Sequence, residues 1–208
     1  MALPARSTYD EKLARILSAS AQVFARKGFH QASMRDISAE TGVSLSGLYH
    51  YFASKDELLY LIQSNAFETL LSGVEEATRE HRGDPEAALR ALVRSHLGYF
   101  AANVPEMKVL SHEADALDGE FESAVLDLKR RYVDVVGAHL APLLPAKNAV
   151  DLRVATFALF GQMNWIYNWY RPERDPKPDA LADQLVHGFL NGICAEMNSP
   201  SAAGTPGV

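Results

Sequence analysis

The amino-acid sequence predicts an all-α protein of about nine helices, and three observations lead to this prediction. Apolar residues recur three and four positions apart along most of the chain, which is the spacing of one helix face. Glycines and prolines stand between these periodic stretches, at the places where helices end. No stretch alternates between apolar and polar residues as a half-buried strand does. We therefore expect a three-helix head over residues 1–54, a larger helical body over residues 55–197, and a disordered tail over residues 198–208.

Composition and charge limit what these parts do. The 208 residues are 48% hydrophobic, enough for a packed core, and the single cysteine, Cys194, excludes an internal disulfide. The net charge is −6, yet residues 1–60 carry seven basic and six acidic side chains, against thirteen and twenty in residues 61–208. Nucleic-acid binding would therefore require a few placed contacts instead of a broad positive field. With no signal-peptide or transmembrane pattern, we expect a cytoplasmic protein.

The head begins with an amphipathic helix over residues 8–27, which Gly28 ends. Ser33 is a good N-cap for a short second helix, and Asp36 three residues later completes a box-like pair. Gly42 ends this second helix, because glycine tolerates the left-handed conformation that a helix C-terminus often requires.

A third short helix is expected over residues 45–51, with Ser44 as its N-cap. It is too short to be stable alone, so Leu48 and Phe52 must hold it through tertiary packing. Its remaining side chains are small, hydrogen-bonding or aromatic, a combination that suits the major groove of DNA. Lys55 lies in the first turn of the next helix, where a cation is unfavourable, and a bound phosphate would explain that position.

These residues carry a resemblance to a known family. The first sixty residues resemble the DNA-binding domain of TetR-type transcriptional regulators, through Ile16, Leu17, Phe24 and residues 27–29, 33–37, 42–44, 48–52 and 54–59. The resemblance implies that double-stranded operator DNA is contacted by Ser33, Arg35, Ser44, Leu45, Ser46, Gly47, Tyr49, His50, Tyr51 and Lys55. Leu45 and Gly47 depart from the usual family pattern, so the operator sequence does not carry over.

Six further helices are expected in the body, over residues 55–81, 85–103, 105–117, 121–140, 150–171 and 179–197. The first runs from the head into the body, and the resemblance implies that it acts as a lever. The fifth is apolar nearly all round, which is typical of a helix covered on several sides. The last two, about 149–171 and 179–197, predict a four-helix interface between two copies of the chain. The resemblance likewise implies a homodimer.

Two pairs of side chains stand one helical turn apart in the fifth body helix: the amides Asn164 and Asn168, and the indoles Trp165 and Trp169. Buried amides need partners, so they either bond within the fold or meet a ligand. Both interpretations stay open, as does the choice between a ligand pocket and the dimer interface for all four residues. The pattern over residues 161–172 resembles the acyl-CoA-responsive branch of the family, which regulates fatty-acid, phenylacetate and sterol-ring degradation.

The second resemblance implies an acyl-CoA thioester as effector, with its acyl chain among apolar helices. We expect the effector to be bound by Phe100, Leu110, Arg130, Arg131, Phe160, Asn164, Trp165, Asn168 and Trp169. The CoA phosphates require cations, and the candidates by chemistry are Arg94, Arg130, Arg131, Arg153 and Arg171.

The sequence contains no nucleophile elbow, phosphate loop or paired-carboxylate motif, so we expect neither an enzyme nor a cofactor. His112, Glu113 and Asp115 lie close together but lack a further ligand at a recognisable spacing, so no metal site is expected. The two resemblances together imply a ligand-responsive repressor that an acyl-CoA releases from its operator. Two alternatives stay open: a regulator or carrier with a different apolar effector, as in multidrug binding, and a helical carrier whose head no longer reads DNA.

Overall fold

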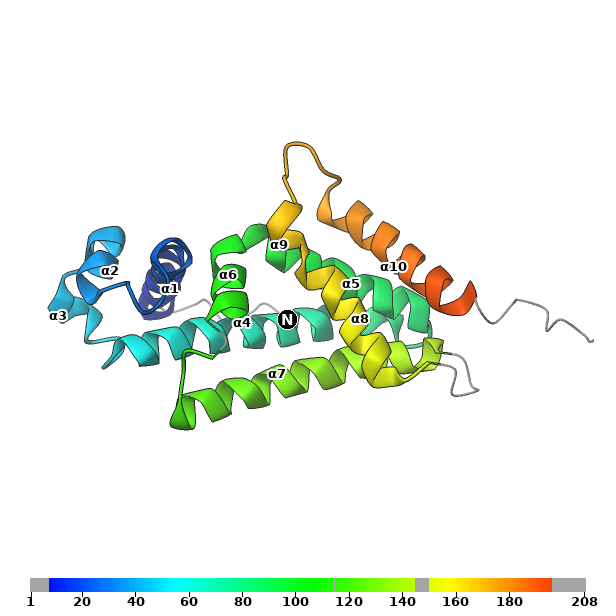
Figure 1. Cartoon of the computed structure of the whole chain (residues 1–208), viewed down its shortest axis with the longest axis horizontal. Coiled ribbons are helices and arrows are strands. Elements are labelled where there is room, and N and C mark those ends of the chain that lie inside the picture. The colour runs from blue at the N-terminus through cyan, green and yellow to red at the C-terminus, as the bar shows by residue number, and fades with distance from the viewer. Residues whose placement is uncertain (1–7, 114, 145–149, 196–208) are drawn as a thin grey trace, which may run out of the picture. The chain divides into compact units, whose positions relative to one another are not determined.

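The computed structural model describes residues 8–113, 115–144 and 150–195, and helices are its only regular elements over that part of the chain (Figure 1). The α-helices are α1 Thr8–Lys27, α2 Met34–Thr41, α3 Leu45–Leu48, α4 Lys55–Thr78, α5 Pro85–Ala102, α6 Val104–His112, α7 Gly119–Leu140, α8 Leu152–Asn164, α9 Ile166–Trp169 and α10 Pro178–Ala195. Two short 3-10 helices, Arg79–His81 and Ala141–Leu143, follow α4 and α7. The predicted all-α class is confirmed, and the expected fifth body helix forms both α8 and α9. The predicted tail over residues 198–208 lies outside the described residues.

The chain forms two compact units, which share three long helices. The first unit contains the described residues up to Ser72 together with Tyr99–Tyr132. The second unit contains Gly73–Gly98 and the described residues from Val133 onward. The boundaries between the units therefore fall within α4, α5 and α7.

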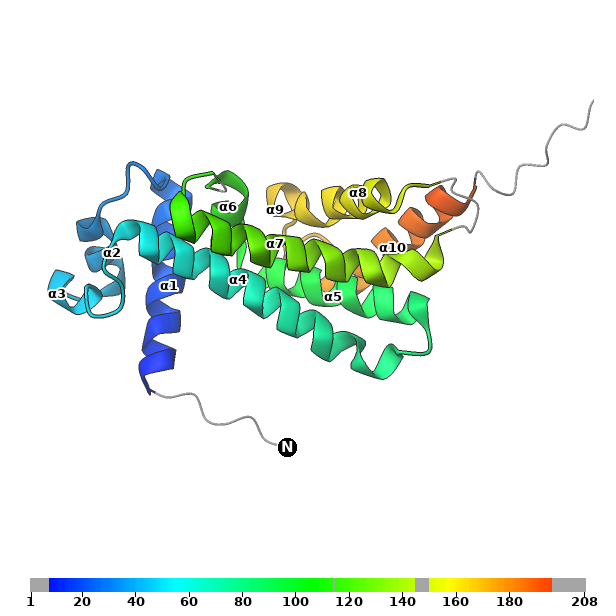
Figure 2. The same ribbon diagram turned by 90° about the horizontal axis from the view of Figure 1, so that it is seen from below.

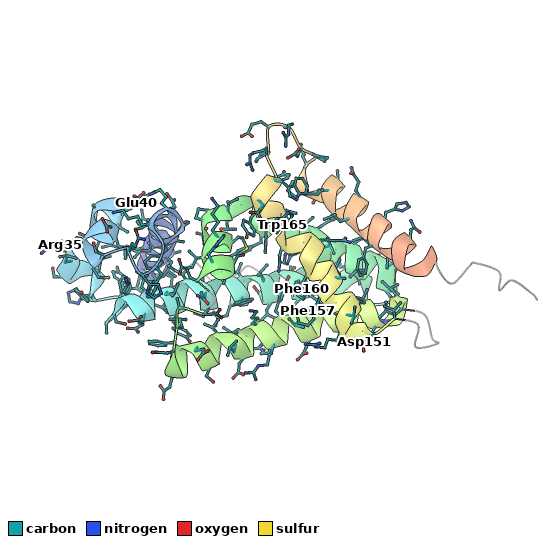
Figure 3. All side chains as sticks on the ribbon, in the orientation of Figure 1. Arg35, Glu40, Asp151, Phe157, Phe160 and Trp165 are labelled. Atoms are coloured by element: carbon teal, nitrogen blue, oxygen red, sulfur yellow. The ribbon has the colours of Figure 1, made fainter. Side chains whose placement is uncertain are left out.

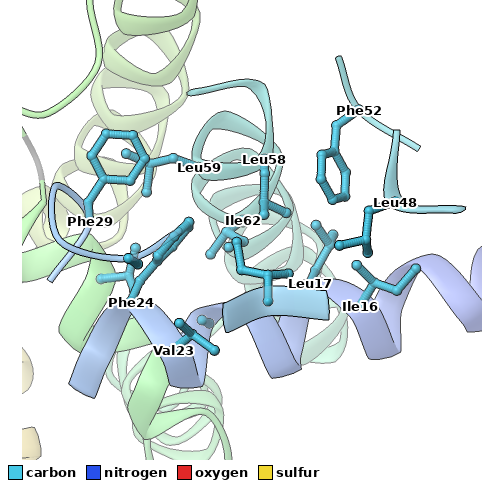
Figure 4. Close-up of a cluster of buried hydrophobic side chains, with 14 of the residues drawn as sticks. Ile16, Leu17, Val23, Phe24, Phe29, Leu48, Phe52, Leu58, Leu59 and Ile62 are labelled. Atoms are coloured by element: carbon cyan, nitrogen blue, oxygen red, sulfur yellow. The ribbon is translucent and has the colours of Figure 1, made fainter. Parts of the chain in front are cut away.

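The core of the first unit holds the short helix α3 in place. Figure 4 shows its central side chains, which come from α1, α3, α4 and the loops beside them: Ile16, Leu17, Val23, Phe24, Phe29, Leu48, Phe52, Leu58, Leu59 and Ile62. Leu48 and Phe52 are 0% and 2% exposed, so the packing predicted for α3 is confirmed. Burial of a side chain of this size contributes roughly 1.5–3 kcal/mol, which a four-residue helix cannot supply from its own hydrogen bonds.

The helix α3 ends at Leu48, and the predicted continuation to Tyr51 is wrong. The chain tightens there, because the N–H of Tyr51 donates to the carbonyl of Leu48 at 2.9 Å. The ring of Tyr51 then stacks on that of Tyr9 in α1, with ring centroids 5.0 Å apart. This tighter path directs Phe52 back into the core.

The helix α6 ends at His112, five residues before the predicted end at Leu117. The side-chain amide of Gln63 in α4 donates to the backbone carbonyl of Glu113 at 3.0 Å, just after the helix. Leu117 is buried in the first unit's core, together with Val125 of α7. Burial of this side chain outside the helix accounts for the early end of α6.

In the second unit, α8 contacts α10 (Figure 2). Charged side chains also connect α5 to α10, since Arg94 donates to both carboxylate oxygens of Asp183 at 2.7 and 2.9 Å. His96 of α5 is only 1% exposed. Burial lowers the pKa of His96 to about 3, against the opposing effect of a hydrogen bond with Asn164, so the imidazole is neutral near pH 7.

Candidate functional site

The helices α2 and α3 form a helix-turn-helix whose ends are fixed by nearby side chains. The N–H of Asp36 donates to Ser33 Oγ at 3.3 Å, and Ser33 N–H donates to Asp36 Oδ2 at 2.9 Å, so the predicted capping box is confirmed. Gly42 ends α2 with a φ of 67°, in the predicted left-handed conformation. Ser44 Oγ accepts the N–H of Gly47 at 3.1 Å and caps α3.

Two ion pairs connect α2 to α1. Lys27 Nζ lies 2.6 Å from Asp36 Oδ1, and Arg26 pairs with Glu40, which Figure 3 labels. The Lys27 ammonium, together with hydrogen bonds from Ser33, holds the pKa of Asp36 well below its usual value. Both pairs are open to solvent, so they orient α2 more than they stabilise it.

Seven of the ten residues predicted to contact DNA are exposed. Two of these are the helix caps Ser33 and Ser44, and the other five lie on α2, on α3 or on the turn that follows: Arg35, Leu45, Ser46, Tyr49 and His50. Tyr49 is 51% exposed and Leu45 is 37% exposed, although both side chains are large and partly apolar. Figure 3 shows Arg35 at this end of the first unit. The exposed side of the helix-turn-helix therefore offers one cation, one imidazole, two hydroxyl groups and an aliphatic side chain.

The other five predicted residues have roles within the fold. Two of them, Ser33 and Ser44, are the helix caps described above. A Cβ atom on Gly47 would lie 2.9 Å from Cγ1 of Val43, so this glycine permits the close packing of the turn. The ring of Tyr51 stacks on Tyr9 of α1. These residues position α3 whatever further contacts they make.

The fifth residue of this group, Lys55, is explained by the fold itself. Its ammonium donates to the carbonyls of Phe29 at 2.7 Å and of Ala32 at 3.0 Å. It also lies 4.3 Å from the centroid of the Phe29 ring. These contacts compensate a cation in the first turn of α4, so the bound phosphate invoked from the sequence is not needed to explain this position.

Sequence reasoning missed the role of Glu113, which it considered only as a weak metal ligand. Glu113 Oε1 accepts the backbone N–H of Phe29 at 2.9 Å, across 84 positions of sequence. The loop between α1 and α2 is thus held by a cation from α4 and by a carboxylate that follows α6. No local pattern signals such a contact. Over the described parts of the chain, no group of three or more His, Cys, Asp or Glu residues is arranged to hold a metal ion.

The residues predicted to bind an effector are divided between the two units. The first unit contains Phe100, Leu110, Arg130 and Arg131, and the second contains Phe160, Asn164, Trp165, Asn168 and Trp169. Phe100 and Phe160 are buried, whereas both asparagines and both tryptophans are exposed. The Asn164 side chain hydrogen-bonds with His96, so one of the two amides has a partner inside the fold.

Four of the five arginines considered for the CoA phosphates have partners within the chain: Arg94 with Asp183, Arg130 with Asp127, Arg153 with the ring of Phe157, and Arg171 with the carbonyl of Tyr170. Arg131 is exposed on α7. The sequence reading also missed a basic hollow of about 320 Å³ in the second unit, whose lining includes Arg79, His81, Arg82 and His139.

Several large apolar side chains of α8 and α9 are exposed in the single chain, although the sequence predicts a helix covered on several sides, in part by a second copy of the chain. The exposed residues are Leu152, Val154, Phe157, Trp165 and Trp169, and Val154 and Trp165 are each 63% exposed. Figure 3 labels Phe157 and Trp165 on this segment. Large apolar side chains exposed close together on one segment are typical of an interaction site. None of the described helices is long and apolar enough to cross a membrane.

A helix-turn-helix with an exposed second helix, joined to a helical body, defines a DNA-binding regulator. Residues 16–60 match the family model of bacterial regulatory proteins of the tetR family, and residues 82–193 match the tetracyclin repressor-like C-terminal domain. The chain belongs to the TetR family. Members of this family are dimeric, DNA-binding transcriptional regulators that respond to small molecules, and they are not enzymes.

Three similar proteins span most of the chain. The fatty acid metabolism regulator protein of Bacillus subtilis is 21% identical over 188 residues, which cover 86% of this chain and 96% of that protein. A TetR-family regulator from Bordetella parapertussis is 30% identical, with a TM-score of 0.81 over 93% of this chain and all of that one. AibR, solved with isovaleryl coenzyme A and operator DNA, is 26% identical, with a TM-score of 0.70 over 84% of this chain and 96% of that one.

Replacing Lys55 with Met is expected to lower the free energy of unfolding by about 1–3 kcal/mol, because two partly buried carbonyls lose a charged donor. The measurement is urea unfolding followed by circular dichroism. Lys108→Met is the matched control, since Lys108 is exposed on α6. Equal unfolding midpoints for the two variants would contradict the structural role of Lys55.

Proposed function

We propose that this protein is a transcriptional repressor that binds its operator as a homodimer and is released by an acyl-CoA thioester. The observation that supports this most is the similarity to AibR over 84% of the chain, since that protein was solved with both isovaleryl coenzyme A and operator DNA. The similarity to a fatty acid metabolism regulator over nearly its whole length supports the same effector class. Residues 1–54 would read DNA and residues 55–197 would bind the effector and dimerise, in the cytoplasm.

Within the head, we assign direct DNA contacts to the exposed group Arg35, Leu45, Ser46, Tyr49 and His50. The remaining predicted residues would act mainly by fixing the ends of α2 and α3 and the loop between α1 and α2; they are Ser33, Ser44, Gly47, Tyr51 and Lys55. This division follows from the hydrogen bonds and packing contacts that the second group makes within the first unit. It accounts for DNA binding by a nearly neutral head, since a dimer doubles each contact.

The DNA assignment predicts two different losses, measured by fluorescence anisotropy on the DNA upstream of the protein's own gene. Tyr49→Ala combined with His50→Ala should abolish specific binding, because both side chains that we assign to base-edge contacts are removed. Arg35→Ala should weaken binding to all sequences and reduce the slope of log K against log salt by about 0.9, the value for one phosphate contact. Arg79→Ala, an exposed arginine of the second unit, should leave that slope unchanged. Specific binding that survives the double substitution would contradict the assignment.

The exposed face of α8 and α9 supports a dimer that uses the last two long helices, as their apolar sequences predict. A glutamate placed in a dry interface costs several kcal/mol, whereas the same residue on a free surface costs little. Val154→Glu is therefore expected to shift the protein from dimer to monomer in light scattering and to weaken operator binding. Leu126→Glu, on a 38% exposed leucine of α7, is the matched control and should stay dimeric. A dimeric Val154→Glu protein would place the interface elsewhere.

The effector proposal is tested by thermal shift and by release from DNA. Acyl-CoAs of varied chain and ring type should raise the melting temperature by several degrees and release the operator, while CoA alone and the free acids do less. Linkage requires operator DNA to weaken acyl-CoA binding by the same factor. Equal responses to unrelated apolar drugs would favour a multidrug-type effector instead.

A further inference from the structure

The basic hollow of the second unit, about 320 Å³ in volume, is used by none of the assignments above. Its walls come from the end of α4, the 3-10 helix Arg79–His81, the start of α5 and the end of α7. All of these segments belong to the second unit, so the hollow is a feature of one compact unit. Its volume lies within the range of roughly 300–1,000 Å³ that is typical of small-molecule sites.

Basic side chains from separate segments meet in this hollow. They are Arg79 and His81 of the 3-10 helix, Arg82 directly after it, and His139 of α7. Residues 61–208 as a whole carry thirteen basic and twenty acidic side chains, so this gathering runs against the charge of the body. Among the described residues that line the hollow, one is acidic, the exposed Glu75. A concave wall on which basic groups predominate concentrates anions.

Arg82 supplies hydrogen-bond donors that the fold itself does not use. This side chain is exposed, and within the described parts of the chain its guanidinium forms no hydrogen bond or ion pair. Arg79 differs, because its Nη2 lies 2.6 Å from Glu76 Oε2, although this pair is open to solvent and therefore weak. A guanidinium presents several N–H groups in one plane, an arrangement that matches the oxygens of a phosphate.

His139 offers a further donor from a different helix. Its Nδ1 lies 2.9 Å from the backbone carbonyl of Val135. A carbonyl oxygen only accepts, so Nδ1 carries the proton of this hydrogen bond and Nε2 is left for another partner. When Nε2 is also protonated, it donates to an anion. The hollow therefore brings donors from the end of α7 and from the segment after α4 to one place.

We propose that this hollow binds the phosphate group of a small molecule, with Arg82 and His139 as contacts. A metal cation fits less well, because the described residues offer no cluster of three acidic, cysteine or histidine ligands. The phosphate belongs either to the CoA of the proposed effector or to a separate phosphorylated metabolite, since both present the same anionic group. The first source is consistent with the partners that occupy four of the five arginines considered for CoA. A ligand here would connect the end of α4 to the end of α7.

The probe for the test is inorganic phosphate, compared with chloride at matched ionic strength, with thermal shift and calorimetry on the full chain. Phosphate should bind the wild type and raise its melting temperature. Arg82→Gln should bind about tenfold more weakly or worse, because charged hydrogen bonds are lost. Arg174→Gln is the matched control, since it removes the same charge from an exposed arginine of the second unit that does not line the hollow. It should bind as the wild type does.

Two more variants separate a built site from a general charge effect. Arg82→Lys keeps the charge but loses the planar fork, so its affinity for phosphate should lie between those of the wild type and Arg82→Gln. His139→Gln, on a separate helix, should also weaken phosphate binding. In chloride, Arg82→Gln should melt as the wild type does, because Arg82 has no partner to lose. Equal phosphate binding by wild type and Arg82→Gln, or an equal loss in Arg174→Gln, would overturn the proposal.

A titration with CoA identifies the source of the phosphate. If the hollow holds the CoA phosphates, Arg82→Gln should weaken CoA binding as much as it weakens phosphate binding. An unchanged affinity for CoA, together with lost phosphate binding, would assign the hollow to a separate phosphorylated metabolite. The measurement with inorganic phosphate uses neither operator DNA nor an acyl-CoA. Its failure is therefore distinguishable from a failure of the proposed function.

Discussion

The DNA-binding head depends on one constraint, which is that a helix of four residues must be held from outside. The helix α3 has too few internal hydrogen bonds to offset the conformational entropy lost when it forms. Leu48 and Phe52 anchor it to a core that α1 and α4 build, and Ser44 satisfies one of its free N–H groups. Each exposed side chain of the helix is therefore aimed by residues that are themselves buried.

The loop between α1 and α2 covers one side of the same core, and Phe29 in this loop contacts both the Lys55 ammonium and the Glu113 carboxylate. Its carbonyl accepts from Lys55, its N–H donates to Glu113, and its ring packs beneath the Lys55 ammonium. One peptide segment thus joins α4 and the end of α6 to the head. A displacement at the start of α4 or the end of α6 changes the hydrogen bonding of this loop directly, so these contacts are a physical route between the helices.

Much of the head could be predicted from the sequence, because its signals are local. The capping box of Ser33 and Asp36, and the left-handed Gly42, depend on residues a few positions apart. Lys55 and Glu113 bond to Phe29 across 26 and 84 positions of sequence, contacts that no local pattern contains. The early end of α3 in particular follows from the burial of Phe52, whose side chain reaches the core only if the chain leaves the helix after Leu48.

The candidate effector residues were harder to predict for a related reason. Periodicity shows which face of an amphipathic helix is buried. In a helix that is apolar all round, it does not show which apolar residues are buried and which are exposed. Phe160 is buried in the second unit's core while Phe157, one turn earlier, is 49% exposed. The two phenylalanines are indistinguishable in the sequence pattern, and only the packing of α8 separates them.

In the proposed dimer, the exposed aromatic side chains of α8 and α9 also make the protein respond to its own abundance. A chain with Phe157 and Trp165 open to water is less stable alone than when paired, so its stability rises with concentration by mass action. At low copy number, the amount of paired protein grows as the square of the amount of chain. A cell that makes slightly more of the chain therefore gains disproportionately more of the dimer able to occupy both halves of an operator, which sharpens the threshold between a free and an occupied operator.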